Sequence, residues 1–308
     1  MGGRPAAEHW PRAARRGIPV VLYCVSLGPV DTPAGRECLT RVLHSASKII
    51  TRETVSIDLA RELHPRGPRP VLAADCALSV LPAPLDEVHE LLRSLDFPEP
   101  RRPLLGFNVG VLSGKQAPFG TEHFERVVAQ ALDRAVRELE VNVLMVETQP
   151  LDLPVASGVL RRMTEASHAG LASHPSLGHA QLTGLLGQVE AFVGMRTHAL
   201  ILASSMHTPV SGVVAYPKTR GYLQSIGRED GMLELSQFSP ETLWSLIGEI
   251  WRGRDSLRVR LAADVERERD RAVKAAAQLS SWLGPPRPVT RSSGLALLRE
   301  SAGKRPRS

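Results

Sequence analysis

Three residues with complementary chemistry are close to one another in the sequence, in the second half of the chain. Arg196 and His198 follow the apolar segment Glu190–Gly194, and Lys218 follows the next apolar segment, Pro209–Val214. Arginine can bind two oxygens of a phosphate or carboxylate, and histidine can donate to an oxyanion or move a proton near neutral pH. This set of residues is suited to holding a small anion and to proton transfer on it.

The elements around these residues are typical of a strand followed by a helix. The segment 190–194 is predicted to be a buried strand that leads into a helix over 197–206, and 209–214 a strand that leads into a helix from Lys218. In an open α/β sheet, ligands bind outside the carboxyl ends of the strands, and a helix start favours an anion. Arg52 follows a predicted strand in the first half, so we expect it to face the same cleft.

The whole chain alternates short apolar segments with amphipathic ones, which predicts parallel sheets covered on both faces. Strands are predicted over residues 17–26, 48–51, 70–74, 104–109, 141–146, 190–194 and 209–214. Helices are predicted over residues 34–46, 52–63, 122–139, 157–167, 178–187, 197–206, 218–226, 239–251 and 255–283. We therefore predict an α/β fold with two Rossmann-like domains facing across a cleft. The predicted parts are a disordered basic tail (1–17), an N-terminal domain (18–95), a C-terminal domain (96–254), a C-terminal helix that crosses back (255–284) and a second disordered basic tail (285–308).

Composition excludes several classes of protein. The chain has 308 residues, of which 43% are apolar, and a net charge of +6. Residues 1–17 contribute +3 and residues 285–308 contribute +5, so the predicted folded part is slightly acidic and does not suit a nucleic-acid groove. The longest apolar run, 18–30, is too short to span a membrane, which takes about 20 residues.

Three widely spaced cysteines indicate reduced thiols, so we expect a cytoplasmic protein whose basic tails could touch the inner membrane face.

Other motifs do not indicate a cofactor or a metal. Gly28 and Gly35 do not form a dinucleotide-binding glycine pattern, and the segment 110–115 has only the second half of a phosphate-binding loop. His168, His174 and His179 do not have the spacing of metal ligands. We therefore expect neither a metal nor a cofactor.

Several segments together resemble the polysaccharide pyruvyl transferase family. The strongest is Val193-Gly-Met-Arg-Thr-His-Ala-Leu-Ile-Leu-Ala203, followed by Pro209-Val and Pro217-Lys-Thr-Arg-Gly-Tyr-Leu-Gln-Ser-Ile-Gly227. In the first half, Leu27-Gly-Pro29, Ile49-Ile-Thr-Arg-Glu53 with Ser56, and Ala74-Asp75 resemble family segments in the same order. The resemblance runs from about residue 18 to residue 283.

The resemblance implies a fold like that of GT-B glycosyltransferases. It also implies transfer of pyruvate from phosphoenolpyruvate, as co-substrate, to a sugar of a surface polysaccharide or its lipid-linked precursor, which gives a ketal. Carried over to this sequence, it assigns catalysis to Arg52, His198 and Lys218, with Arg196 beside them. Arg196 is assigned to substrate binding, together with Gly194, Thr197 and Tyr216, which flank these residues.

The chain departs from the family pattern in three places. The strand–turn–helix units that precede the position of Ile18 in the family are missing, so we expect an N-terminally shortened first domain. Tyr216-Pro217-Lys218 is one residue shorter than the usual Tyr-x-Pro-Lys, and Thr197 replaces a leucine.

Two alternatives stay open. One is a GT-B glycosyltransferase that uses a nucleotide sugar, for which Glu147, after a predicted strand, could bind ribose hydroxyls. The other is a catalytically impaired, truncated family member that keeps only the anion pocket.

Overall fold

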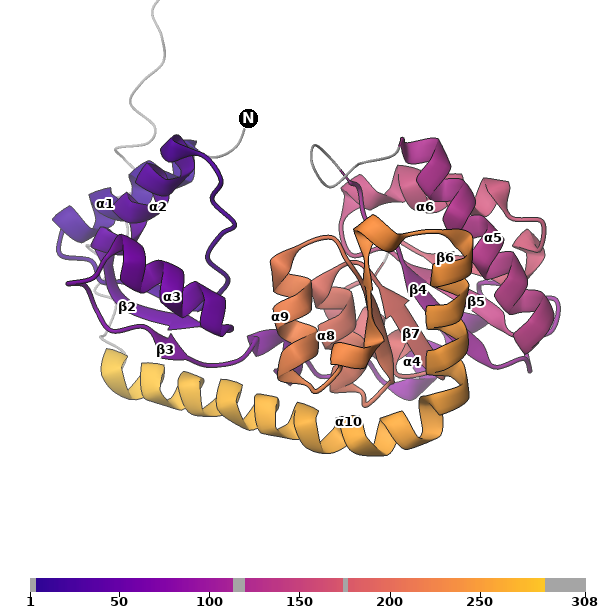
Figure 1. Cartoon of the computed structure of the whole chain (residues 1–308). Helices are drawn as coiled ribbons and strands as arrows, with labels where there is room; N and C mark the ends of the chain where they lie inside the picture. The colour runs from indigo at the N-terminus through magenta and orange to yellow at the C-terminus, as the bar shows by residue number, and fades with distance from the viewer. Residues whose placement is uncertain (1–3, 113–119, 174–176, 286–308) are drawn as a thin grey trace, which may run out of the picture. The chain divides into compact units, whose positions relative to one another are not determined.

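The structure is a computed structural model, and it describes residues 4–112, 120–173 and 177–285 (Figure 1). The chain divides into two compact units between Val273 and Lys274. Both sheets, the helices between them and the candidate site lie in the first unit. Among the described residues, no helix is long and apolar enough to cross a membrane.

A small parallel sheet forms from the first part of the chain. Its strands lie side by side in the order β1 (Val20–Val25), β2 (Ala46–Thr51) and β3 (Val71–Leu72). Helices α2 (Pro33–Ser45) and α3 (Thr54–Leu63) connect them. Helix α2 begins where Thr32 Oγ1 accepts from the Gly35 amide at 3.1 Å, with proline at the first helical position. The buried core of this part is small and centres on Leu43 and Ile49.

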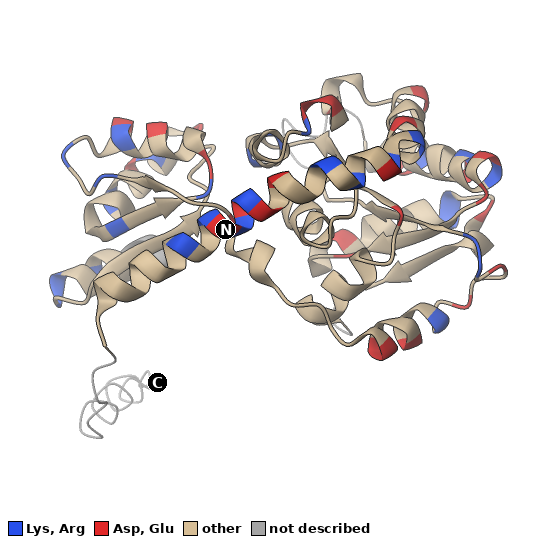
Figure 2. Ribbon diagram, turned by 90° about the horizontal axis from the view of Figure 1, so that it is seen from below, with Lys and Arg blue, Asp and Glu red and all other residues tan. Residues whose placement is uncertain are grey.

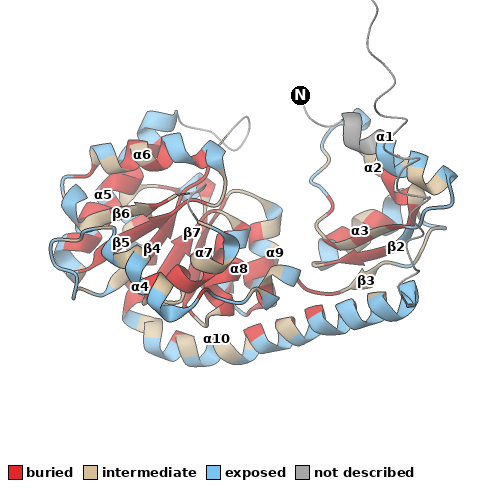
Figure 3. Cartoon of the chain, turned by 180° about the vertical axis from the view of Figure 1, so that it is seen from behind, coloured by how far each residue is buried: buried red, intermediate tan, exposed pale blue. Residues whose placement is uncertain are grey.

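A second sheet of six parallel strands follows, in the order β6-β5-β4-β7-β8-β9. The strands are β4 (Leu104–Asn108), β5 (Asn142–Val146), β6 (Ala169–Ala172), β7 (Ala191–Gly194), β8 (Val210–Val214) and β9 (Met232–Glu234). Helices on this part are α4 (Leu85–Arg93), α5 (Thr121–Leu139), α6 (Leu153–Arg162), α7 (His179–Leu186), α8 (Thr197–Ser205) and α9 (Pro217–Ser225). Strands β5, β7 and β8 are buried along their whole length, as expected for a parallel sheet with both faces covered (Figure 3). The α/β class with parallel sheets is thereby confirmed.

Helix α10 runs without interruption over Pro240–Leu283, where we predicted two helices separated at 252–254. We expected Asp255 or Ser256 to cap a separate last helix, but Ser256 donates its hydroxyl to the Gly253 carbonyl at 2.9 Å, within the same helix. A glycine inside a helix costs only about 1 kcal/mol, and buried Ile250 and Leu257, seven residues apart, continue one apolar face across it.

The N-terminal segment also differs from the prediction. Helix α1 covers Arg4–Arg15, where we predicted a disordered tail, and it packs against α2. A helix of this length is marginal alone in water, so its contact with α2 supports it. Of the predicted C-terminal tail, residues 286–308 lie outside the described residues.

The segment that we took for the end of the first domain packs with the second sheet. Leu78 and Val88 belong to the buried cluster beneath α7 and α8. The Ala83 amide donates to the Ala180 carbonyl at 2.9 Å, and Gln181 donates to Glu87 at 2.8 Å. By packing, the first sheet's part therefore ends near residue 75, about twenty residues before the predicted boundary at 95.

Positive and negative side chains are interspersed along the helices of the fold (Figure 2). Many of them form exposed ion pairs between neighbouring turns, such as Arg134 with Glu138 at 2.6 Å. Mixed charge of this kind favours solubility.

Candidate active site

The candidate site forms where strands of both sheets end. Arg52 directly follows β2, and Asp75 follows β3 and caps a short helical turn by accepting from the Ala77 amide at 2.9 Å. His198 lies in the first turn of α8, just after β7, and Lys218 lies in the first turn of α9, just after β8. The strands within each sheet are parallel, so their carboxyl ends lie along one edge of that sheet. Ligands of α/β proteins bind at this edge.

Arg52 and His198 meet although 146 residues separate them. Arg52 Nε donates to Ser26 Oγ at 2.6 Å, and Arg52 Nη1 pairs with the buried Asp75 carboxylate. The same Nη1 lies 3.3 Å from His198 Nε2. A guanidinium can only donate, so a hydrogen bond here requires His198 Nε2 as acceptor, with the ring proton on Nδ1. The same Nε2 lies 3.8 Å from Asp75 Oδ2. The predicted partnership of Arg52 with His198 therefore has a direct contact in this structure.

Desolvation, together with nearby positive charge, lowers two pKa values. Desolvation lowers the pKa of His198 below its ordinary value of 6.5, and the positive charges of Arg52 and Lys218 add to this, while Asp75 opposes it. Desolvation also lowers the pKa of Lys218, helped by Arg52 and Arg196 and opposed by Glu53. Each shift comes partly from cations crowded together, an arrangement that a bound anion would relieve.

Arg196 is held in a different way from Arg52. Its Nε donates to Asp152 Oδ2 at 2.8 Å and its Nη2 to Asp152 Oδ1, and Asp152 is buried. Its backbone amide donates to Asn108 Oδ1 at 3.0 Å. A Cβ at Gly110 would lie 2.7 Å from Arg196 Nε, so glycine is needed where the guanidinium crosses the backbone. Arg196 thus adds positive charge near Lys218, while its guanidinium is bound to a carboxylate of its own.

Asn108 and Asp152 are site residues that the sequence analysis missed. Asn108 is fully buried at the carboxyl end of β4, and its side-chain amide also donates to the Val146 carbonyl at 2.8 Å. A polar residue at the end of an apolar strand was the available signal for Asn108. Asp152 lies in a short helical turn between β5 and α6 and had no comparable signal.

The three flanking residues predicted to bind substrate have different surroundings. Gly194 is buried, and a Cβ there would lie 2.7 Å from the Phe192 ring. Thr197 is also buried, and its hydroxyl lies 2.9 Å from the Thr219 hydroxyl, which joins the starts of α8 and α9. Lys218 Nζ lies 5.7 Å from the centre of the Tyr216 ring. Tyr216 is therefore the member of this group beside the ionic cluster, and the assignment of all three to substrate stays a prediction.

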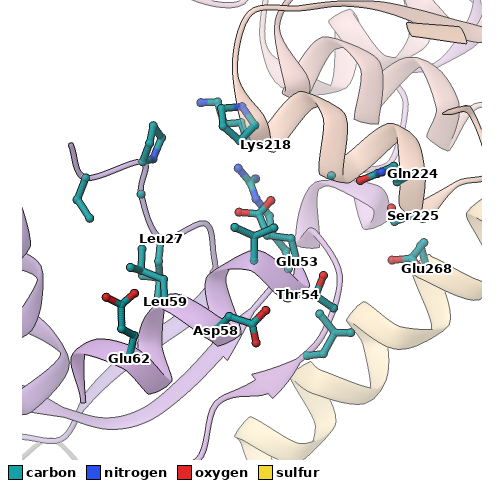
Figure 4. Close-up of a pocket in the computed structure, with 18 of the residues that line it drawn as sticks. Leu27, Glu53, Thr54, Asp58, Leu59, Glu62, Lys218, Gln224, Ser225 and Glu268 are labelled. Atoms are coloured by element: carbon teal, nitrogen blue, oxygen red, sulfur yellow. The ribbon is translucent and has the colours of Figure 1, made fainter. Parts of the chain in front are cut away.

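Two pockets adjoin the ionic cluster. The larger, of about 650 Å³, has Arg52 and Lys218 in its wall together with Glu53 and residues of α3 (Figure 4). The second, of about 460 Å³, is lined by His198, Glu147 and apolar side chains that include Leu182. Arg52 and Lys218 thus face the larger pocket, and His198 faces the second one.

The other residues considered in the sequence have different surroundings. Ser113 and Lys115 of the segment 110–115, together with His174, fall outside the described residues. His168 Nδ1 lies 3.0 Å from the Asn142 side chain. His179 begins α7 and lines the same pocket as His198. In the part of the chain that the structure describes, no group of three or more histidine, cysteine or acidic side chains is arranged to hold a metal ion.

The family of the protein follows from a comparison with protein-family models. The model of the polysaccharide pyruvyl transferases matches residues 2–216. The chain belongs to this family. The matched segment includes Arg52, Asp75, Arg196 and His198, and Lys218 lies two residues beyond it. A search of curated proteins found no match.

Solved structures of other proteins share the fold. HepE of Anabaena, in complex with UDP and glucose, has a TM-score of 0.61 and 11% identity over 90% of this chain and 76% of its own. The UDP-GlcNAc 2-epimerase of Neisseria meningitidis, bound to UDP-GlcNAc, has a TM-score of 0.61 and 10% identity, with 89% and 72% coverage. The epimerase of Methanocaldococcus jannaschii has a TM-score of 0.56 and 9% identity, with 80% and 67% coverage. This pyruvyl transferase family member therefore has a GT-B-like fold of two Rossmann-like parts.

Proposed function

We propose that this family member transfers the pyruvyl group of phosphoenolpyruvate to two hydroxyls of a sugar, forming a cyclic ketal and releasing phosphate. The sugar belongs to a surface polysaccharide or its lipid-linked precursor. The observation that carries the proposal is the contact of Arg52 with His198 beside Lys218, at the carboxyl ends of strands from both sheets. Because phosphoenolpyruvate is made inside the cell, the reaction takes place in the cytoplasm or at the inner membrane face.

The residues suit the charge of this substrate. Phosphoenolpyruvate carries a carboxylate and a phosphate, and Arg52 and Lys218 supply charged donors in a partly dehydrated pocket. Arg52 is 12% exposed and is fixed by Ser26 and Asp75, so its side chain loses little conformational entropy when an anion binds to it. Fixed cations in such a place stabilise negative charge on the departing phosphate.

A proton balance assigns a role to His198. The methylene carbon takes a proton, which leaves C2 as an oxocarbenium-like centre that the first sugar hydroxyl attacks. The second hydroxyl then bonds to C2 as the C2–O bond to phosphate breaks. Two hydroxyl protons are lost in all, one balanced by the new C–H bond and one by the released phosphate. Binding of the anion offsets the cations that lower the pKa of His198, so the imidazole gains a proton beside the substrate and can deliver it.

The test is ketal formation by the purified full chain with phosphoenolpyruvate and p-nitrophenyl hexosides, followed by NMR of the ketal methyl group and by phosphate release. His198→Ala and Lys218→Ala are each expected to lower the rate by roughly 100-fold or more. His89→Ala, on the exposed face of α4, is the matched control. Wild-type rates in both site variants would contradict the proposed function.

A nucleotide-sugar glycosyltransferase is the second candidate, favoured by the pocket that holds Glu147 and His198. The similar HepE structure contains UDP and glucose. Titration with phosphoenolpyruvate and with UDP-glucose separates the two candidates, because a pyruvyl transferase has no use for the nucleotide. Thermal stabilisation by phosphoenolpyruvate without turnover would instead indicate a member that only binds the anion.

A further inference from the structure

We propose that the larger pocket is the acceptor site for a neutral terminal hexose, and that Glu53 is the base that takes the proton of the attacking hydroxyl. This inference rests on the proposed function, because the hydroxyl attacks C2 of phosphoenolpyruvate held on Arg52 and Lys218. Arg52 and Glu53 are consecutive residues and line the same pocket, so a substrate on the guanidinium lies beside the carboxylate.

The charge balance of the pocket favours a neutral ligand beyond its cationic end. Its lining holds four basic and four acidic side chains. Arg36 pairs with Glu62, and Arg271 pairs with Glu268 at 3.0 Å, so these four charges are matched within the wall. Arg52 and Lys218 form the end that we assign to phosphoenolpyruvate. A carboxylate on the acceptor would find no further unmatched cation among the described lining residues of this pocket. The hydroxyls of a neutral sugar, by contrast, can donate to the carboxylates.

The remaining wall suits the carbon face of a sugar. Leu27, Val55 and Leu59 of the first sheet's part contribute apolar surface opposite the polar groups of α9, which include Gln224. Figure 4 shows these two sides of the pocket, with Glu53 and Lys218 coming from opposite elements. A pocket of about 650 Å³ is within the roughly 300–1,000 Å³ typical of small-molecule sites. It therefore has room for a hexose next to phosphoenolpyruvate.

Local contacts fix the Glu53 carboxylate with one oxygen anchored. Glu53 occupies the position just before α3, and its Oε1 accepts from the Ser56 hydroxyl at 2.9 Å. The Ser56 hydroxyl in turn accepts from the buried Leu27 amide at 2.8 Å. The other oxygen, Oε2, is directed toward α9, 3.6 Å from where a Cβ at Gly221 would lie. The absence of a side chain at Gly221 thus leaves space around the oxygen that we assign to the hydroxyl.

The step assigned to Glu53 is balanced. The acceptor oxygen bonds to C2 of the protonated substrate while its O–H bond breaks, and the proton moves to Glu53 Oε2. The positive charge on C2 is thereby neutralised and the carboxylate becomes a carboxylic acid. It returns the proton to solvent before the next turnover. General-base assistance of this kind typically contributes 10²–10⁴-fold to a rate.

Glu53→Gln separates this role from a purely structural one. The glutamine oxygen can still accept from Ser56, so the start of α3 and the Leu27 turn keep their contacts. The variant loses only the charge and the ability to take a proton. We expect kcat for ketal formation to fall by at least about 100-fold, with the affinity for phosphoenolpyruvate within about threefold of wild type. Glu53→Asp, which keeps the carboxylate, is expected to recover part of the rate, and Glu37→Gln on α2, outside the pocket, is the matched control.

The measurements are calorimetric titration with phosphoenolpyruvate and ketal formation on p-nitrophenyl β-galactoside, β-glucoside and β-glucuronide. We expect the neutral hexosides to be better acceptors than the glucuronide. Glu53→Gln with a near wild-type kcat, an equal loss of phosphoenolpyruvate affinity in that variant, or a preference for the glucuronide would each overturn the proposal. A wild-type protein that binds phosphoenolpyruvate but neither binds nor modifies the neutral hexosides would overturn it and leave the donor assignment standing. Absence of phosphoenolpyruvate binding would instead refute the proposed function.

Discussion

The two sheets contribute to the site in different ways. In the six-stranded sheet, β7 and β8 are buried along their whole length, and they lead into the helices whose first turns hold His198 and Lys218. In the three-stranded sheet, β1 alternates buried with half-buried residues and the core is small, yet this part supplies Arg52, Asp75 and most of the pocket's acidic side chains. The better-packed part thus carries His198 and Lys218, and the part with the smaller core carries Arg52, Asp75 and Glu53.

The two buried arginine–aspartate pairs offer the largest test of this difference. Asp75→Ala leaves Arg52 without its carboxylate at the small sheet, and Asp152→Ala does the same to Arg196 at the large one. Removing one partner of a buried pair typically costs about 3–5 kcal/mol, so both variants should lose that much free energy of unfolding. Urea unfolding measures it. A loss below about 1 kcal/mol in either variant would mean that its pair is effectively solvated.

Core truncations compare the two parts directly. Leu43 and Leu132 are both fully buried, one in each core. Each Leu→Ala change should cost about 2–5 kcal/mol. Hydrogen exchange should show that Leu43→Ala opens residues 20–72 while the strands of the large sheet stay protected. The smaller core buries less apolar surface, so its free energy of local unfolding is lower. Uniform opening of both sheets would show that the two parts unfold as one cooperative unit.

A smaller effect is expected at the start of α2. Thr32→Ala removes the oxygen that accepts from the Gly35 amide, and loss of such a cap typically costs about 1 kcal/mol. Thermal unfolding measures the change, with Thr32→Ser, which keeps the oxygen, as control. Equal stability of the alanine and serine variants would mean that water replaces the cap.

The smallest expected change is in the titration of His198. Its pKa lies below 6.5 in the free protein because of desolvation and the cations around it, so the ring is neutral at pH 7. Phosphoenolpyruvate should raise this pKa, since the anion offsets Arg52 and Lys218. NMR titration of the imidazole with and without the ligand measures the shift. An unchanged or lower pKa would contradict binding of the anion beside His198.

Much of the fold was predictable from local pattern. The helix expected over 122–139 is α5, and the strands expected over 141–146 and 209–214 are β5 and β8, because long apolar segments have a clear period. Strands β6 and β9 were missed, since they have only four and three residues and lack enough pattern to recognise. The continuity of α10 was not predicted. A glycine and a potential cap residue occur both inside helices and at helix ends, so the sequence does not show whether the helix continues.

The sequence by itself determined the alternation of strands and helices, the family, and the positions of Arg52, His198 and Lys218 at strand ends, because these depend on local pattern and residue type. Tertiary structure alone decided which charges meet. Arg52 and Arg196 both follow a strand and precede a helix, and each is bound by a buried aspartate, but Arg52 also contacts His198. Ion pairing depends on distances of a few ångströms between segments far apart in the chain, and no local pattern encodes those distances.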